Sequence, residues 1–204
     1  MRIYDISIPI KPGMIVYPNN PEVMFVVQEG ATTTHTEMSF GTHTGTHMDA
    51  PRHAFAEGQT VDKVPLEACF GAARVLDVSD AKDSVKISDL EKFDIQKRER
   101  ILLKTSNSKR GFDEFYDDYV YLDGDAADYL VEKDISLVAI DYLSIKQRGG
   151  SDQRPHTSLL EKNIPIIEAV DLSRVGEGDY ILSAFPLKLE GLDGSPLRAV
   201  LIKE

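Results

Sequence analysis

The sequence of 204 residues contains one cysteine, Cys69, and no tryptophan. A single thiol cannot form a disulfide within the chain, so a reducing compartment is expected, and we predict a cytoplasmic protein. Cys69 has the apolar neighbours Ala68 and Phe70 and is predicted to be a small core residue instead of a nucleophile. The amino terminus lacks the apolar segment of a signal peptide. No apolar run approaches the roughly 20 residues that span a bilayer, so no membrane association is expected.

Basic residues are also in short supply. The chain has 23 lysines and arginines against 34 aspartates and glutamates, which gives a net charge of -11. Nucleic-acid phosphates require surfaces rich in lysine and arginine, so this balance argues against a nucleic-acid partner. The hydrophobic content of 42% is ordinary for a globular protein, and neither a repeat nor a break in composition suggests a boundary. We therefore expect a single domain over residues 1–204.

The hydrophobic pattern predicts an α/β fold with a β-rich front end. Short runs rich in β-branched residues alternate with proline and glycine in the first quarter, and helix-like and strand-like segments follow one another later. This order is typical of a mixed α/β core. Strands are expected at 3–9, 23–28, 35–40, 72–78, 101–104, 136–142, 164–170, 180–185 and 198–202, and helices at 125–133 and 158–162.

Histidine is scarce as well, but its distribution is uneven. Three of the five histidines lie within residues 43–53, which read His-Thr-Gly-Thr-His-Met-Asp-Ala-Pro-Arg-His. Imidazole nitrogens and carboxylate oxygens are ligands for zinc, manganese and iron, so His43, His47, Asp49 and His53 indicate a metal centre. All four occupy odd positions, and in an extended segment alternate residues point to one face. The segment is predicted to be a strand that runs into a loop at Pro51.

The number of donors indicates what kind of site this is. His43, His47 and Asp49 would provide three protein ligands and leave a position open for water or substrate, which is the pattern of a catalytic site. His53 lies beyond the predicted turn and has two possible roles. It is either a further ligand or, as we favour, the general acid or base, because imidazole transfers protons near neutral pH.

Three other residues are candidates for the site. His35 lies on an alternating strand with no carboxylate close in the motif, and it is predicted to be a surface or hydrogen-bonded residue. His156 stands at an element boundary before a helix-like run. Glu168 lies in an apolar strand, where it either faces outward or is buried and paired with a cation, because an unpaired buried carboxylate is costly.

The motif resembles the His-x-Gly-Thr-His-x-Asp-x-Pro-x-His signature of the cyclase family, which includes bacterial kynurenine formamidases (arylformamidases) and isatin hydrolases. The resemblance covers nearly the whole chain. It extends over residues 4–7 and 16–18 near the start, over 65–66, 71–72, 77–78 and 139–144 in the middle, and over 187–191 and 193–199 at the end.

The resemblance implies a fold, a site and an assembly. The fold would be a swivelling β/β/α domain with a mixed sheet and flanking helices, assembled into homodimers or homotetramers. His43, His47 and Asp49 would bind one divalent metal, and Asp49 would bridge to a second. His156 and Glu168, twelve residues apart as in the formamidases, would complete the two-metal site. Zinc is the expected metal, with manganese as the alternative, and His53 would be the catalytic acid/base.

The implied activity is metal-dependent hydrolysis of a C–N amide bond in a small aromatic substrate. An arylformamidase acting on N-formylkynurenine, in tryptophan catabolism, is the leading hypothesis, and hydrolysis of a lactam or lactone such as isatin is the alternative. A non-hydrolytic cyclase or a metal- or ligand-binding protein on the same fold stays open. Kynurenine formamidases carry a substrate-contacting tryptophan where this chain has residues 16–18. Tyr17 is the candidate for that place, although it could instead be a packing aromatic in a turn.

Overall fold

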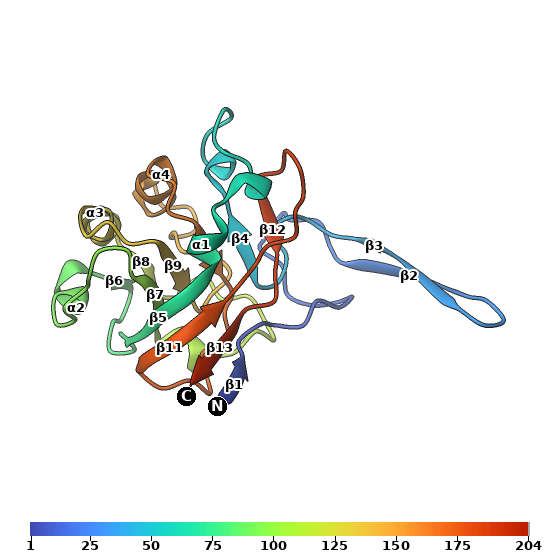
Figure 1. Ribbon diagram of the computed structural model, residues 1–204, viewed down its shortest axis with the longest axis horizontal. Helices are drawn as coiled ribbons and strands as arrows, with labels where there is room; N and C mark the ends of the chain where they lie inside the picture. The colour runs from blue at the N-terminus through green and yellow to red at the C-terminus, as the bar shows by residue number, and fades with distance from the viewer. Residues whose placement is uncertain (204) are drawn as a thin grey trace.

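A single curled sheet of nine strands organises the computed structural model, which describes residues 1–203 (Figure 1). The strands β5, β7, β9 and β10 run parallel to one another, and the pairs on either side are antiparallel. From edge to edge the order is β1 (Arg2–Asp5), β13 (Val200–Lys203), β11 (Gly178–Ser183), β5 (Phe70–Asp77), β7 (Arg100–Lys104), β9 (Leu137–Ile140), β10 (Ile166–Glu168), β4 (His47–Asp49) and β12 (Gly194–Pro196).

The central strands are apolar on both faces because each face is covered. In β7, Ile101 and Leu103 pack into one hydrophobic core, and Leu102 between them packs into a second core on the opposite face. The same alternation holds in β9, where Val138 belongs to the first core and Ala139 to the second. Continuous apolar runs of this kind are expected for parallel strands buried on both sides.

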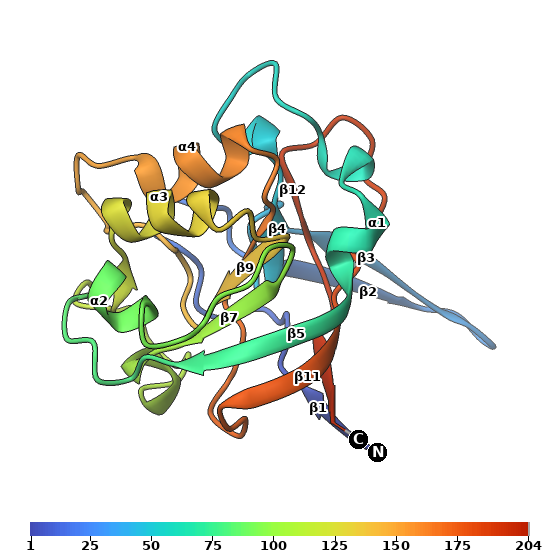
Figure 2. The ribbon, with the colours of Figure 1, turned by 60° about the vertical axis from the view of Figure 1, so that its left-hand side comes forward.

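Helices cover the first core. The helices α3 (Gly124–Glu132) and α4 (Arg154–Glu161) pack side by side on one side of the sheet, with the short α2 (Ile87–Leu90) next to α3 (Figure 2). The carboxylate of Asp123 caps α3 by accepting a hydrogen bond from the backbone N–H of Asp125. A short helix, α1 (Leu66–Cys69), leads into β5, and the strands β6 (Ser84–Val85) and β8 (Tyr121–Leu122) form a small parallel pair.

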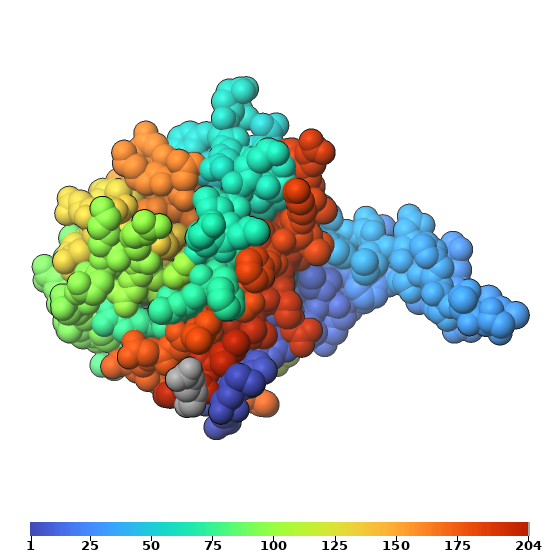
Figure 3. All heavy atoms as spheres, in the orientation of Figure 1, coloured from blue at the N-terminus to red at the C-terminus, as the bar shows by residue number. Residues whose placement is uncertain are grey.

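A two-stranded hairpin projects away from this body. It consists of β2 (Met24–Glu29) and β3 (Thr34–Ser39), and Figures 1 and 3 show it as an arm extending well beyond the other elements. Both faces of the arm are largely exposed to solvent. Within the described chain the hairpin forms its own small sheet, separate from the nine-stranded one.

The predicted mixed α/β fold is confirmed, with differences in detail. The segment 43–53 is not one extended run, because residues 43–46 form a turn, β4 covers only His47–Asp49, and a 3-10 turn follows at Pro51–His53. The predicted helix at 158–162 begins earlier, at Arg154, with Pro155 in its first turn. Cys69 is fully buried, as predicted, and burial raises the pKa of its thiol to about 11. No helix among residues 1–203 has the length and apolar composition needed to cross a membrane.

Candidate metal centre

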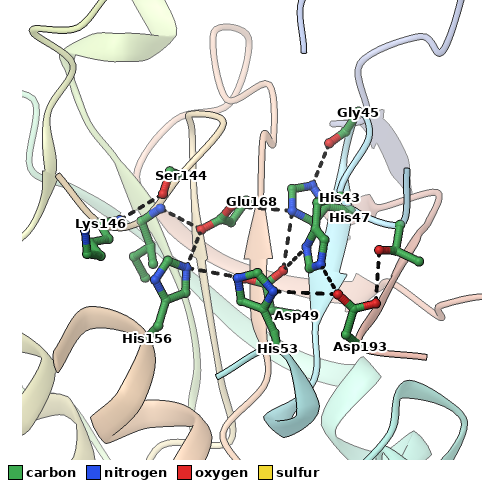
Figure 4. Close-up of polar contacts among 12 residues, drawn as sticks. His43, Gly45, His47, Asp49, His53, Ser144, Lys146, His156, Glu168 and Asp193 are labelled. Atoms are coloured by element: carbon green, nitrogen blue, oxygen red, sulfur yellow. Dashed lines mark hydrogen bonds and ion pairs between the residues drawn. The ribbon is translucent and has the colours of Figure 1, made fainter. Parts of the chain in front are cut away.

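The pairing of β4 with β10 brings together residues that lie far apart in the sequence. These strands are antiparallel, and Glu168 on β10 stands opposite His47 on β4. Residues two apart in β4 point to the same side, so Asp49 shares the face of His47. His156 reaches the same place from the first half of α4. Figure 4 shows these side chains pointing toward one another from the two strands and the helix.

A left-handed turn places His43 beside this group. Gly45 has a φ of +65°, and a Cβ atom there would lie 2.9 Å from Cγ1 of Ile10, so the turn requires glycine. The carbonyl oxygen of Gly45 accepts a hydrogen bond of 2.9 Å from Nδ1 of His47. Because a carbonyl can only accept, the proton of neutral His47 is on Nδ1, and the lone pair of Nε2 faces the cluster.

The donor atoms form two adjacent sets. In the first, Nε2 of His47 lies 3.4 Å from Oδ1 of Asp49 and 3.4 Å from Oε2 of Glu168, and Nδ1 of His43 lies 2.8 Å from the same Asp49 oxygen. In the second, Nε2 of His156 lies 3.2 Å from Oε1 of Glu168 and 3.5 Å from Oδ2 of Asp49. Each carboxylate therefore offers one oxygen to each set.

Unsatisfied atoms at the centre of the cluster indicate that these residues fit a metal. Within residues 1–203, Nε2 of His47 and Oδ2 of Asp49 are buried and lack a hydrogen-bond partner. Buried polar atoms are normally paired, and an ion accounts for such exceptions. Nitrogen and carboxylate donors are the set that zinc and manganese accept. The clusters His43, Asp49, His53 and His47, Asp49, Glu168 each have donor atoms close enough to hold one ion.

The close approach of histidines and carboxylates shifts the pKa values of the cluster residues. Burial favours neutral His47, but its contacts with Asp49 and Glu168 outweigh burial and raise its pKa to about 10. His156 behaves alike, and the same two carboxylates raise its pKa to about 9 against the effect of burial. Burial opposes the charged form of Asp49 too, yet the surrounding histidines hold its pKa well below the ordinary range. The carboxylates therefore stay ionised in the buried site.

A cavity of about 310 Å³ opens next to the cluster. His53 stands at its side with a third of the side chain exposed (33%), whereas the side chain of Asp49 is fully buried. Partial burial lowers the pKa of His53, and the nearby His43 and His156 act in the same direction against the attraction of Asp49. The lining consists of Tyr17, Asn20, His43, His53, Leu143, Ser144, Lys146, Gln153, His156 and Glu168.

Tyr17 lines this cavity and also begins a turn, in which its carbonyl oxygen accepts a hydrogen bond from the N–H of Asn20. Its ring meets that of Phe115 edge to face, with 5.7 Å between the centroids. Burial raises the pKa of Tyr17, so its hydroxyl stays protonated in the wall. The tyrosine ring offers an apolar surface and one polar group to a bound molecule.

The structure thus brings together His43, His47, Asp49, His53, His156, Glu168 and Tyr17, all of which were expected from the sequence. His35 lies apart from them on the exposed hairpin. One residue that contacts the cluster was not predicted from the sequence, Asp193, whose Oδ2 lies 2.8 Å from Nε2 of His43. Its place in the carboxyl-terminal segment 193–199, where the family resemblance is strong, was the available signal. Backbone groups were beyond sequence analysis, such as the N–H of Ile145 that donates to Oε1 of Glu168 at 2.6 Å.

Comparisons with known proteins show what this chain is similar to. The profile of the Cyclase family matches residues 4–147. The kynurenine formamidase of Salinibacter ruber (strain DSM 13855 / M31) is 35% identical over 206 residues, which cover 98% of this chain and 97% of the relative. A solved structure described as a predicted metal-dependent hydrolase from Bacillus stearothermophilus superposes with a TM-score of 0.88 at 34% identity, over 98% of this chain and 97% of the other.

A more distant structure shares the fold. Isatin hydrolase A from Labrenzia aggregata, bound to benzyl benzoate, has a TM-score of 0.88 at 21% identity and covers 100% of this chain and 94% of its own. The profile match over most of the chain and the full-length relatives lead to one conclusion. The chain belongs to the Cyclase family.

Proposed function

We propose that this protein is a metal-dependent hydrolase that cleaves the C–N amide bond of an aromatic formamide. The observation that carries the proposal is the double donor set. Asp49 and Glu168 each direct one oxygen to His47 and the other to His156. Both sets border a cavity that is also lined by the partly exposed His53. Two metal positions bridged by carboxylates are a recurrent arrangement in hydrolytic enzymes.

The residues proposed to hold metal are His43, His47, Asp49, His156 and Glu168. We propose zinc as the metal, with manganese as the alternative, because the donors suit both and availability often decides between them. When bound, the metal would polarise the amide carbonyl and lower the pKa of a water molecule. Within the described chain the nitrogen and oxygen donors of the two sets are all buried or nearly so, so they are shielded from competing solvent.

His53 is proposed to be the general acid and base. It lines the cavity, its side chain remains partly exposed, and its lowered pKa keeps the ring neutral near pH 7. A neutral imidazole takes the proton of the attacking water and then returns one to the leaving nitrogen of the amide. The C–N bond breaks as the amine leaves, and a carboxylic acid (formic acid for a formamide) is the second product.

The wall of the cavity supports an aromatic substrate. Tyr17 lines the cavity and is supported edge to face by Phe115, and a planar ring of the substrate would pack against Tyr17. Relatives 35% identical over nearly the full length are kynurenine formamidases, so N-formylkynurenine is the proposed substrate. Tyrosine differs from tryptophan in size and carries a hydroxyl, and this difference is proposed to alter the preference among aryl formamides.

The experiment compares turnover and metal content in a His53→Ala variant. We expect hydrolysis of N-formylkynurenine to fall by about 10²–10⁴-fold, because a general acid–base group contributes that much to a rate. Zinc content, measured by mass spectrometry of the purified protein, is expected to be unchanged. Isatin serves as the competing substrate, and the ratio of kcat/KM for the two compounds tests the substrate class.

His35→Ala is the matched control, since it removes the same side chain from the exposed hairpin. It is expected to keep the activity and metal content of the native protein. If His53→Ala loses zinc together with turnover, His53 is a ligand. If the native, zinc-loaded protein hydrolyses neither compound, the hydrolase proposal fails.

A homodimer is proposed as the working assembly. In the arm, the facing pairs Phe25–Met38 and Val27–Thr36 lie on one face of the hairpin. Phe25 and Met38 continue into an apolar groove of about 660 Å³ at the base of the arm, which Ile8 helps to line. An isolated two-stranded hairpin is marginally stable in water, so a second copy lying on this face supplies the missing cover. Cys69, single and buried, supports the proposed cytoplasmic location.

A further inference from the structure

The Asp193 carboxylate is held in place from several directions. It lies in the loop just before β12, where its backbone carbonyl accepts a hydrogen bond of 2.9 Å from the N–H of Ala50. The hydroxyl of Thr42 donates to Oδ1 at 3.1 Å. The other oxygen, Oδ2, is directed to Nε2 of His43 at 2.8 Å (Figure 4). One hydrogen bond therefore anchors the backbone of Asp193 and another its carboxylate, whose second oxygen contacts the imidazole.

Each nitrogen of the His43 ring lies within hydrogen-bond distance of a carboxylate oxygen. Nδ1 lies 2.8 Å from Oδ1 of Asp49, inside the donor set, and Nε2 lies 2.8 Å from Oδ2 of Asp193, outside it. A histidine that binds a metal through Nδ1 must carry its proton on Nε2, because the ligating nitrogen needs its lone pair. An ionised carboxylate at Nε2 accepts that proton's hydrogen bond and so selects the ligating tautomer.

The neighbouring Gly194 shows that space for this ring is built into the strand. A Cβ atom at Gly194 would lie 2.8 Å from Cε1 of His43 and 2.8 Å from the carbonyl oxygen of Met48. Gly194 pairs with Asp49 in the register of β12 with β4. Gly194, which has no side chain, thus leaves room for the imidazole of His43, and the carboxylate of Asp193 lies next to that ring.

The same carboxylate oxygen also faces His53. Oδ2 of Asp193 lies 3.9 Å from Nδ1 of His53, and the rings of His43 and His53 have centroids 4.2 Å apart. A rotation of the His53 ring that shortened this distance would form a hydrogen bond. Nδ1 of His53 would then carry the proton, and Nε2 would be free to exchange a proton with the reacting groups.

We propose that Asp193 is a positioning residue that fixes His43 as an Nδ1 ligand of the metal and orients His53 for proton transfer. This role rests on the proposed metal centre and is independent of which amide is the substrate. Asp193 and Gly194 thus contribute to the site by positioning its histidines, although neither residue is proposed as a metal ligand.

The test measures metal binding apart from turnover. Asp193→Ala and Asp193→Asn are stripped of metal, and their affinity for Zn²⁺ is determined by competition with a chromophoric chelator. Removing a carboxylate behind a metal-binding histidine weakens metal affinity by about 10–100-fold, and that loss is expected in both variants. The visible spectrum of the Co²⁺-loaded protein, which reports the ligand geometry, is expected to change as well. At saturating Zn²⁺, kcat for the hydrolysed amide is expected to fall with little change in KM.

Asp62→Ala is the control for a loosened loop, because alanine has no oxygen to accept the hydrogen bond from Gly191. Asp62 accepts a hydrogen bond of 3.1 Å from the N–H of Gly191, two residues before Asp193, and does not contact the histidines. This variant is expected to bind Zn²⁺ like the native protein.

Native Zn²⁺ affinity and an unchanged Co²⁺ spectrum in a folded Asp193→Ala protein overturn the role at His43. An unchanged kcat at saturating metal overturns the role at His53. If the alanine variant does not fold, the isosteric asparagine variant decides. Absence of amide hydrolysis by the native protein would defeat the proposed function while leaving the metal-affinity result intact.

Discussion

In the absence of metal, His47 and His156 hold their protons far more tightly than ordinary histidines do. Their pKa values rise to about 10 and about 9, because the ionised Asp49 and Glu168 outweigh the effect of burial. A proton and a metal ion compete for the same lone pair of Nε2 in each ring. Metal binding at the proposed centre is therefore coupled to the release of protons.

We predict that Zn²⁺ binding at pH 7 releases protons and tightens as pH rises. Affinity should increase by about tenfold per pH unit for each proton displaced, up to the pKa values of the two rings. Titration calorimetry in two buffers of different ionisation enthalpy measures the released protons directly. Equal heats in the two buffers would show that no proton leaves and would contradict the prediction.

The same shifts predict the stability of the metal-free protein. A histidine whose pKa is raised by folding stabilises the fold fully below its unfolded pKa of about 6.5 and progressively less as pH approaches the folded value. The Tm of chelator-treated protein is thus expected to fall between pH 6.5 and pH 10. A Tm that rises over this range would indicate that the two rings are neutral in the metal-free fold.

At the scale of elements, the turn at residues 43–46 determines whether His43 and His47 meet. Gly45 and Gly13 both have a left-handed backbone, with φ of +65° and +74°. Only Gly45 is also crowded, because a Cβ atom there would lie 2.9 Å from Cγ1 of Ile10, whereas no described atom is within 4 Å at Gly13. Alanine at Gly13 would therefore introduce backbone strain alone, whereas alanine at Gly45 would add a collision with Ile10.

Gly45→Ala is expected to lower the free energy of unfolding by about 1–3 kcal/mol for the strained backbone, plus a further loss from the collision with Ile10. Zinc affinity should fall too, because His43 shifts relative to His47. Gly13→Ala is expected to show the strain alone and native zinc affinity. Urea denaturation and chelator competition measure the two effects. Equal behaviour of the two variants would mean that the contact with Ile10 is unimportant.

Elements were predictable from sequence where a regular pattern extends over several residues. The strands β5, β7 and β9 and the helix α3 were all located to within a few residues, because apolar positions repeat along them. The strand β12, Gly194–Pro196, was missed, since three residues containing glycine and proline carry no periodic signal. Its pairing with β4 is set by tertiary contacts, and Asp193 was missed as a site residue for the same reason.

The motif at 43–53 was predictable in chemistry but not in shape. Donor types and their concentration identified the candidate ligands, and the alternation rule is correct for His47 and Asp49 in β4. It does not hold for His43, which lies in the turn at residues 43–46, or for His53, which lies in the 3-10 turn Pro51–His53. The meeting with Glu168 came from the family resemblance, since a register between strands 119 positions apart leaves no mark in local sequence.

At the scale of the whole molecule, the arm formed by β2 and β3 is largely exposed to solvent in the single chain. Val27 is 56% exposed and lies on the face that leads into the apolar groove, and Val26 is 54% exposed on the opposite face. Because the arm and the groove belong to the same chain, two copies can exchange arms around a twofold axis. The prediction of one domain over residues 1–204 stays a prediction, as does the assembly.

Val27→Lys is predicted to weaken the proposed dimer, because a charge would be buried against the partner. A cost of about 2 kcal/mol corresponds to a roughly 30-fold higher dissociation constant. Val26→Lys, an equal change on the other face, is expected to leave the dimer intact. Sedimentation equilibrium over a range of concentrations measures both constants. Equal effects of the two variants, or a native protein that is monomeric throughout, would contradict the arrangement.

The pairing of β4 with β10 has a consequence for the order of events during synthesis. A chain emerging from the ribosome exposes His43, His47 and Asp49 long before His156 and Glu168 are made. Until β10 docks against β4, the nascent protein offers only part of its donor set. Full loading of the proposed metal centre would therefore follow completion of the fold, and a polypeptide that terminates before residue 168 would lack part of the proposed donor set.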